Sequence, residues 1–243
     1  STVGAWGYNN SGKLGTGNNN NSNVPVQVGT DTDWQKADAG YRASLAIKTD
    51  GTLWAWGENG DGQLGNGSTS DSNIPVLISN GWACIAAGYE YSLGVKTDGT
   101  LWGWGYNGDG NLGNGTEDDS NVPVQSGTAT NWSKVYATVD EYFSFALNQD
   151  GNLFGFGGNG DGYLGDGTYD DSSTPVPVQV DEPSAFATTS RIVTVNPLPT
   201  ATITGTATAC GSLSLTASGG SSYGWTGGNT TNTAANTFTS WGT

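Results

Sequence analysis

The chain has 243 residues, with 22 Asp or Glu, 7 Lys or Arg and no His, so its formal net charge is −15. Binding to nucleic acid or to an anionic membrane surface depends on clustered cations, and this charge argues against both kinds of partner. Without His, the Ser-His and Cys-His nucleophile pairs and His-ligated metals are excluded, and no apolar run reaches the roughly 18 residues that a membrane-spanning helix needs.

A motif built on Trp, Gly, Asn and Leu occurs four times along the chain. Its second aromatic residue falls at Trp6, Trp56, Trp104 and Phe156, with spacings of 50, 48 and 52 residues. The same three spacings separate the Leu-Gly pairs at Leu14, Leu64, Leu112 and Leu164, and the Pro-Val pairs at Pro25, Pro75, Pro123 and Pro175. A fixed period of this size indicates one supersecondary unit per copy, stacked on its neighbours.

Each unit is predicted to contain four short strands. In chain order these are residues 24–28, 34–39, 44–48 and 52–56, and the equivalent segments of the later copies. The last two segments alternate in polarity and flank an Asp-Gly pair, which is a strong signal for a β-hairpin. About four strands in some fifty residues is the size of a propeller blade.

A glycine-rich connection follows each Trp motif. Residues 59–67 read Asn-Gly-Asp-Gly-Gln-Leu-Gly-Asn-Gly, and glycine lets such a loop take left-handed conformations and approach the next blade closely. The single Leu is expected to plug into the core. The repeated aromatic residues are predicted to be core residues as well, because each holds a fixed place in an alternating strand; they are Trp6, Trp56, Trp104 and Phe156.

The pattern W-x-W-G-x-N-x-x-G-x-L-G-x-G, then Pro-Val, an aromatic strand, G-x-x-x-S-L and D-G, resembles the repeat of the regulator of chromosome condensation family. The resemblance covers roughly residues 1–180 and implies a β-propeller, which usually has seven blades in this family. The chain departs from the family pattern at Ala43, Tyr91 and Phe143, where the family commonly has His, and at Asp140, which replaces a Gly.

The C-terminal part has a different composition, rich in Thr, Ala and Ser. Residues 192–243 resemble the immunoglobulin-like repeats of secreted Bacteroidota surface proteins, with strands expected at 212–216 and 223–225. The predicted fold class is therefore all-β: three full propeller blades and a partial one over residues 1–180, a linker at 181–191 and an incomplete immunoglobulin-like sandwich. We expect a fragment of a longer protein, its propeller completed by missing chain or by a second copy.

The predicted function is that of a non-enzymatic scaffold or adhesin, secreted or on a bacterial cell surface, that binds a protein or glycan through loops on the propeller rim. The resemblance to Bacteroidota repeats implies export by the type IX secretion system. One alternative is a secreted inhibitor, because a bacterial β-lactamase-inhibitor protein resembles the same propeller repeat. Another is guanine-nucleotide exchange, the role of eukaryotic family members, which the negative charge disfavours.

Candidate binding residues are those at which the copies differ. Tyr8 and Tyr106 occupy a position that Glu58 and Gly158 hold in the other copies, and a position that varies between constant neighbours is expected at the surface. Acidic clusters before the Pro-Val pairs are predicted to form an acidic binding rim, although solvation alone also explains such charge runs. The rim residues are Asp71, Asp118, Asp119, Asp170 and Asp171.

No catalytic residue, metal or cofactor is predicted. Paired carboxylates, as in glycosidases, are the catalytic option left open, but Asp61, Asp109 and Asp161 hold equivalent places in successive copies, which favours a structural role. The same Asn-x-Asp-Gly segments resemble pieces of calcium loops. Ordinary turn chemistry also explains them, and the Glu that closes an EF-hand loop is missing.

Overall fold

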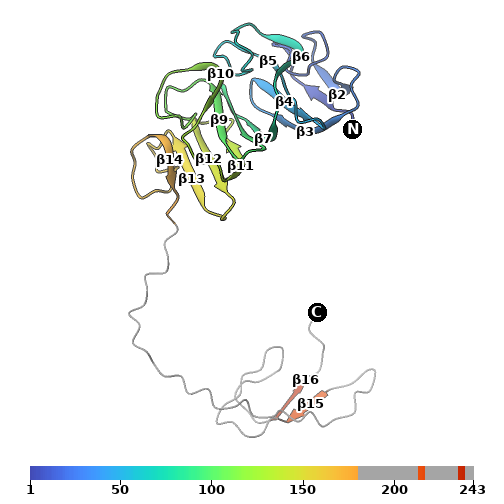
Figure 1. The fold of residues 1–243 in the computed structure, drawn as a ribbon. Coiled ribbons are helices and arrows are strands. Elements are labelled where there is room, and N and C mark those ends of the chain that lie inside the picture. The colour runs from blue at the N-terminus through green and yellow to red at the C-terminus, as the bar shows by residue number, and fades with distance from the viewer. Residues whose placement is uncertain (180–212, 217–234, 239–243) are drawn as a thin grey trace. The chain divides into compact units, whose positions relative to one another are not determined.

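The computed structural model describes residues 1–179, 213–216 and 235–238. The chain divides into two compact units, Ser1–Asp181 and Glu182–Thr243. All regular elements in the described ranges are β-strands (Figure 1), which confirms the all-β prediction. No helix in these ranges is long and apolar enough to cross a membrane.

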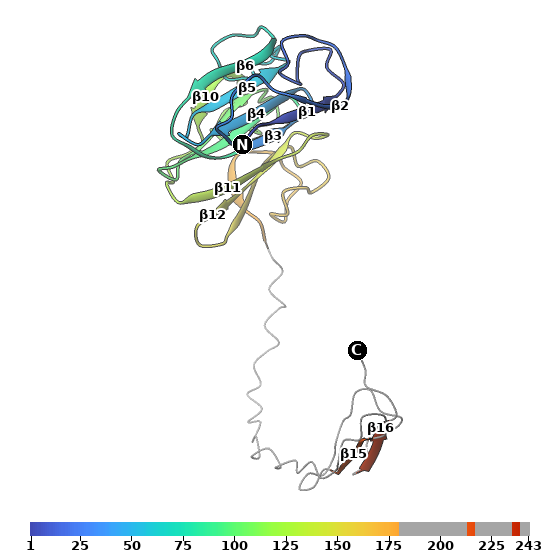
Figure 2. The ribbon, with the colours of Figure 1, turned by 90° about the vertical axis from the view of Figure 1, so that its right-hand side faces the viewer.

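The first unit consists of four consecutive antiparallel sheets, numbered here as blades 1 to 4 (Figure 2). Blade 1 has two strands, and the other three blades have four strands each, hydrogen-bonded in chain order. This confirms the prediction of three full blades and a partial one. The strands are β1 (Gly4–Gly7) and β2 (Ser22–Gln27); β3 (Trp34–Ala39), β4 (Ala43–Lys48), β5 (Leu53–Gly57) and β6 (Ser72–Ser79); β7 (Trp82–Ala87), β8 (Tyr91–Lys96), β9 (Leu101–Gly105) and β10 (Ser120–Gln125); β11 (Trp132–Ala137), β12 (Phe143–Asn148), β13 (Leu153–Gly157) and β14 (Ser172–Pro177).

The sequence motif begins in the third strand of a blade, not in the first. Trp54 and Trp56 lie in β5, so each copy of the motif completes one blade with its first two strands and begins the next blade with its last two. The predicted Asp-Gly turn joins β4 to β5, where Ile47 pairs with Leu53. The sequence repeat is therefore offset by two strands from the sheets, so that each copy of the motif contributes strands to two consecutive blades.

Large aromatic side chains pack each blade against the preceding one. Trp104 is fully buried, and its indole Nε1 donates a hydrogen bond to the carbonyl oxygen of Gln63 at 2.9 Å, in the loop between β5 and β6. Gly65 in that loop has φ +74°, and a Cβ there would lie 2.7 Å from Trp104. Glycine is thus required both by the left-handed backbone and by the close approach of the ring. Trp56 and Phe156 are buried in the same way.

Trp6 does not follow the core prediction. Its side chain is 62% exposed, whereas Trp56 is 1% exposed and Trp104 is 0% exposed. The buried rings each face the glycine-rich loop of a preceding blade, and the described residues place no such loop against blade 1. The prediction that Trp6 is a core residue is therefore wrong for the described structure.

The second unit contains two described strands, β15 (Leu213–Thr216) and β16 (Ala235–Phe238), which pair antiparallel with Leu213 opposite Phe238. The predicted strand at 212–216 agrees with β15. The linker predicted at 181–191 and the strand predicted at 223–225 lie outside the described residues, and the immunoglobulin-like assignment stays a prediction.

Candidate binding face

A buried asparagine organises every glycine-rich loop. Asn59 is fully buried; its side-chain Oδ1 accepts a hydrogen bond from the backbone N of Leu64 at 2.9 Å, and its Nδ2 donates to the carbonyl oxygens of Ser68 and Ser70 at 2.9 and 3.0 Å. Equivalent bonds recur around Asn9, Asn107 and Asn159. These fully satisfied amides hold the loops in one conformation.

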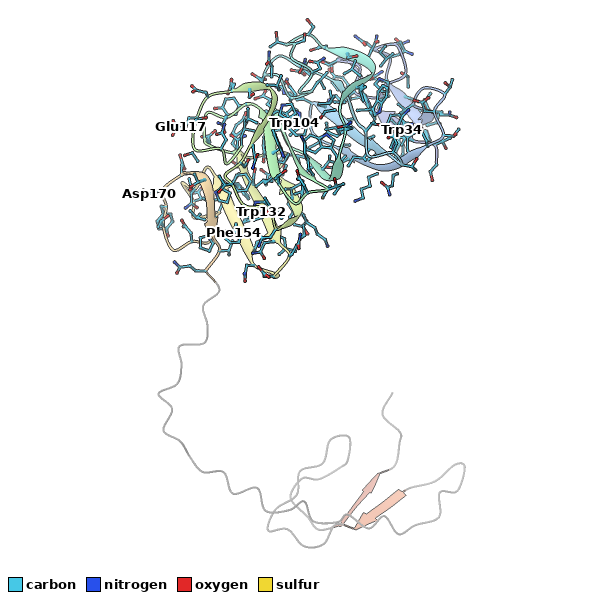
Figure 3. The ribbon with its side chains drawn as sticks, in the orientation of Figure 1. Trp34, Trp104, Glu117, Trp132, Phe154 and Asp170 are labelled. Carbon is cyan, nitrogen blue, oxygen red and sulfur yellow. The ribbon has the colours of Figure 1, made fainter. Side chains whose placement is uncertain are left out.

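Three residues of the predicted acidic rim take part in this framework. The Oδ1 atoms of Asp71, Asp119 and Asp171 accept hydrogen bonds from the backbone N of the loop asparagine, at 2.9, 2.7 and 2.6 Å. In the first copy Asn21 does the same at 2.8 Å, which shows that the position needs an acceptor and not a charge. Asp118 and Asp170 have exposed side chains, and Figure 3 labels Asp170 on its loop. The binding role of the rim stays a prediction.

The variable positions of the sequence meet at one end of the blades. In an antiparallel meander, alternate connections fall at the same end of the sheet, so the loops after β5, β9 and β13 adjoin the β3–β4, β7–β8 and β11–β12 turns. Backbone bonds confirm this: Glu58 N donates to Arg42 O at 3.0 Å, and Gly158 N donates to Tyr142 O at 2.9 Å. Tyr8, Glu58, Tyr106 and Gly158 therefore share one face with these turns.

Four tyrosines form a row across this face, from blade 2 to blade 4. Tyr41 stacks on Tyr89 with ring centroids 4.7 Å apart, Tyr89 meets Tyr142 edge to face at 5.8 Å, and Tyr142 meets Tyr106 at 4.6 Å. Aromatic pairs at such separations stabilise each other's position beyond the area they bury. The row is thus a continuous, partly exposed aromatic surface that joins three blades.

Two cations of the chain lie on the blade 1 and blade 2 part of the face. Arg42 pairs with Glu58, its Nε lies 2.9 Å from Glu90 Oε1, and its guanidinium lies 5.1 Å from the centre of the Tyr89 ring. The Tyr89 hydroxyl and the two carboxylates raise the pKa of Arg42 further above its usual value. Lys13 Nζ lies 5.4 Å from the Tyr8 ring. On this part of the face, cations of the same chain therefore neutralise the carboxylates and lie over the aromatic rings.

Blade 4 carries a pocket of about 300 Å³ at the same end, here called the blade-4 pocket. The ring of Tyr163 stacks on Phe143 with centroids 4.8 Å apart, and its hydroxyl donates to Asp161 at 3.0 Å. None of the residues that line the pocket is Lys or Arg. Its walls are four carboxylates and three aromatic rings, together with two glycines: Asp109, Glu141, Asp161, Asp171, Tyr142, Phe143, Tyr163, Gly158 and Gly160.

The electrostatics of the pocket favour a cation. Burial raises the pKa of Asp109, the Tyr106 hydroxyl opposes that rise, and the charges of Asp171 and Glu117 add to it. The hydrogen bond to Asp161, with the charges of Asp161 and Glu141, raises the pKa of the Tyr163 hydroxyl. Carboxylates that repel one another in this way gain most from a positive group placed between them.

The Asn-x-Asp-Gly segments use their asparagine oxygen for the loop itself, since Oδ1 of Asn59 and Oδ1 of Asn107 each accept a hydrogen bond from a leucine backbone N. Among the described residues there is no group of three or more Cys, Asp or Glu side chains with the geometry of a metal site. Neither observation supports calcium binding by the described loops.

Sequence reasoning found Tyr106, Gly158 and Asp171 near the pocket, but it missed the residues of the β-turns. Glu141 and Tyr142 lie three and two residues before Ser144, the constant Ser of the second strand, at positions held by Tyr41 and Arg42 in blade 2. They vary between copies just as Tyr8 and Glu58 do. The same criterion, applied to the turns, identifies them.

Comparison with protein-family models gives a match over most of the first unit. The model of the regulator of chromosome condensation (RCC1) repeat matches residues 3–47, 50–95, 98–147 and 150–196. A second model of this repeat matches residues 34–63 and 82–111. No curated protein sequence matches the chain significantly.

Solved structures share the fold. Human WBSCR16 is 25% identical with a TM-score of 0.65, over 74% of this chain and 48% of that chain. Prp20p from Saccharomyces cerevisiae, described with its binding to Gsp1p and histones, is 21% identical with a TM-score of 0.64, over 74% of this chain and 47% of that chain. The same yeast protein, in a structure with Kap60, gives 22% identity, a TM-score of 0.65 and coverage of 74% and 45%. The chain spans less than half the length of each of these proteins.

Proposed function

The chain belongs to the family of regulator of chromosome condensation (RCC1) repeats, and we propose that it is a non-enzymatic, protein-binding scaffold. Its propeller blades are the rigid support, and the face with the tyrosine row is the binding surface. The blade-4 pocket receives a basic side chain, Arg or Lys, from an extended segment of the partner protein.

The blade-4 pocket is the observation that carries this proposal. It contains the two kinds of group that bind a guanidinium or ammonium ion: ring faces for cation–π contact and carboxylates for charge-assisted hydrogen bonds. Arg42 makes both kinds of contact in blade 2, with the Tyr89 ring and with Glu58. In blade 4 the same combination is present without a cation from the pocket's own lining residues.

The charge of the whole chain supports the same partner class. With a formal net charge of −15, the protein attracts basic segments over a distance and accelerates their association, and this effect falls as salt rises. The tyrosine row next to the pocket gives the rest of the segment an aromatic surface, the type of residue that dominates many protein interfaces.

The proposed location is outside the cell or on the cell surface. The small number of Lys residues, the acidic composition and the sequence of residues 192–243, which resembles surface-protein repeats, support it. Antibody labelling of intact host cells tests this point, with a cytosolic protein as control; labelling only after lysis contradicts it.

The likeness to Prp20p is one of fold, at 21% identity, and supports neither nucleotide exchange nor histone binding by this chain. Guanine-nucleotide exchange is an alternative with a direct test, release of labelled nucleotide from a small GTPase, and we expect no acceleration. The secreted-inhibitor alternative predicts loss of β-lactamase activity when the chain is added.

Isothermal titration of the chain with a short Gly-Arg-Gly-Arg-Gly peptide tests the proposed function. We expect one site per chain, weaker binding at high salt, and none for the peptide with Glu in place of Arg. The double variant Asp161→Asn and Glu141→Gln should lower the affinity at least about tenfold, or about 1.4 kcal/mol.

The control removes the same charge from outside the pocket. Asp50→Asn with Asp118→Asn changes two exposed acids, one in the turn between β4 and β5 and one on the loop of blade 3, neither of which lines the pocket, and should leave the affinity within about twofold of wild type. Equal losses from both double variants would mean that only net charge attracts the peptide, and the pocket would have no specific role.

A further inference from the structure

Three turn residues at equivalent positions of blades 2, 3 and 4 are bonded to one another on the face that carries the tyrosine row. Each lies two residues before the constant Ser of the second strand: Arg42, Glu90 and Tyr142. Arg42 Nε lies 2.9 Å from Glu90 Oε1, and the Tyr142 hydroxyl donates a hydrogen bond to Glu90 Oε2 at 2.8 Å. The repeat thus places a cation, an anion and a hydroxyl in consecutive blades, and the anion joins the other two.

Glu90 is held through both its backbone and its side chain. The side chain is 17% exposed, and its two carboxylate oxygens have different partners. The carbonyl oxygen of Glu90 accepts a hydrogen bond from Tyr106 N at 3.0 Å. Gly105 permits this approach, because its φ is +101° and a Cβ there would lie 2.5 Å from that carbonyl oxygen. Glu90 is therefore a fixed, charged acceptor for the Tyr142 hydroxyl.

The ring of Tyr142 has contacts with two further residues of the row. Tyr89 meets it edge to face with centroids 5.8 Å apart, and Tyr106 lies against it at 4.6 Å. Burial, together with the hydrogen bond and the charge of Glu90, raises the pKa of the Tyr142 hydroxyl. At neutral pH this hydroxyl therefore keeps its proton and acts as a donor. The two rings and the carboxylate hold Tyr142 in one orientation.

Tyr142 connects this network to the blade-4 pocket. Its ring is one of the three that line the pocket, whereas Glu90 is not a lining residue. The bond to Glu90 keeps the hydroxyl from the four pocket carboxylates, which also accept hydrogen bonds. A hydroxyl without this bond would compete with a partner's basic group for the same carboxylates. A hydrogen bond to an anion also makes the ring more electron-rich, which strengthens its attraction for a cation.

We infer that Glu90 is a positioning residue for the blade-4 pocket: by accepting the hydrogen bond of the Tyr142 hydroxyl, it holds this ring as a pocket wall that faces the partner's basic group. The inference rests on the proposed function of the pocket. Arg42 occupies the other carboxylate oxygen of Glu90, so the ion pair between blades 2 and 3 supports the binding site of blade 4. Glu90 itself does not contact the partner.

A double-mutant cycle tests this inference by isothermal titration with the Gly-Arg-Gly-Arg-Gly peptide. Tyr142→Phe removes the hydroxyl and keeps the ring. Glu90→Gln keeps the shape of the side chain, and Arg42 attracts its remaining oxygen, so the amide nitrogen faces the Tyr142 hydroxyl, which loses its acceptor. We expect each single variant to weaken binding about fivefold. Because both changes break the same hydrogen bond, the double variant should be at most about twofold weaker than either single variant.

The cycle separates positioning from the loss of a negative charge. An effect of the Glu90 charge alone would persist in the Tyr142→Phe background, and the two losses would then multiply to about twenty-five-fold. The control is Asp118→Asn, which removes one exposed charge from the loop of blade 3 and should leave the affinity within about twofold of wild type. Circular dichroism establishes that each variant is folded.

The results distinguish failure of the inference from failure of the proposed function. Losses that multiply overturn the inference, as does wild-type affinity in either folded single variant or an equal loss in Asp118→Asn. Each of these results leaves the pocket as the peptide-binding site. Absence of peptide binding by the wild type overturns the proposed function and this inference together.

Discussion

Blades 2 and 4 have the same framework and different binding faces. In both, a buried asparagine fixes the loop through the same set of hydrogen bonds. In blade 2 the turn before the second strand provides Arg42, which lies between two carboxylates, whereas in blade 4 Tyr142 takes that position beside a pocket with four acids. The constant residues keep the blade folded, and the variable ones decide whether an acidic site is neutralised within the chain or left open to a partner.

The largest expected effect comes from removing the shared framework. Asn59→Ala or Asn159→Ala leaves several buried backbone groups without partners, and each should lower the free energy of unfolding by about 2–4 kcal/mol. Urea denaturation followed by Trp fluorescence measures this. As a control, Asn10→Ala changes an exposed asparagine next to Asn9 in blade 1. It should lower the free energy of unfolding by less than about 0.5 kcal/mol. A large loss of stability for one of these two variants and none for the other would contradict the claim that the two loops have the same framework.

Charge removal should have opposite effects in the two blades. Arg42→Met leaves Glu58 and Glu90 without their cation, and we expect a loss of stability of up to about 1 kcal/mol, limited by solvent screening. Glu141→Gln removes a charge from an uncompensated acidic group and should be neutral or slightly stabilising. Urea denaturation at low salt tests both variants. Destabilisation of similar size in the two would contradict the view that only blade 2 is neutralised internally.

The smallest expected effect is on the pH dependence of stability. The ordinary pKa of an Asp is 3.8, and burial with nearby acids raises that of Asp109. The folded state therefore holds this proton more tightly, and the resulting stabilisation is complete below the ordinary pKa and lost as pH rises through the raised one.

Asp109→Asn removes this dependence, so its stability should fall less than that of the wild type as pH rises from about 4, by under about 1 kcal/mol. Urea unfolding at several pH values measures the difference, with the exposed Asp118→Asn as control. An unchanged profile in Asp109→Asn would show that the carboxyl is not perturbed.

Much of the fold followed from the sequence because the repeat is strict. The spacing of Trp56, Trp104 and Phe156 identified the blades, and the Asp-Gly pairs located the hairpins. Trp6 was predicted wrongly for a physical reason: its pattern is that of a core residue, but its burial depends on a loop of a preceding blade, which a residue's own segment does not reveal. The offset between motif and blade was not predicted either, because it depends on which strands pair, and the sequence period does not show the pairing.

The candidate site was predicted less completely. Variation between copies pointed to Tyr106 and Gly158, but the pocket also needs Asp109 from the blade 3 loop beside Asp161 from the blade 4 loop. A sequence period makes these residues equivalent and does not show that one blade's residue lines its neighbour's pocket. The acids at 71, 119 and 171 show another limit: the acidic cluster did not reveal that the loop uses these side chains as hydrogen-bond acceptors. Their role in binding stays a prediction.

Exchanging the residues that distinguish the two blades tests the central claim most directly. Tyr142→Arg places the cation of blade 2 in blade 4, and Arg42→Tyr removes it from blade 2. In calorimetric titration with the arginine peptide, we predict that Tyr142→Arg abolishes binding and that Arg42→Tyr adds a second site. Binding of wild-type strength by a folded Tyr142→Arg variant would contradict the claim that the blade-4 pocket receives the partner's basic side chain.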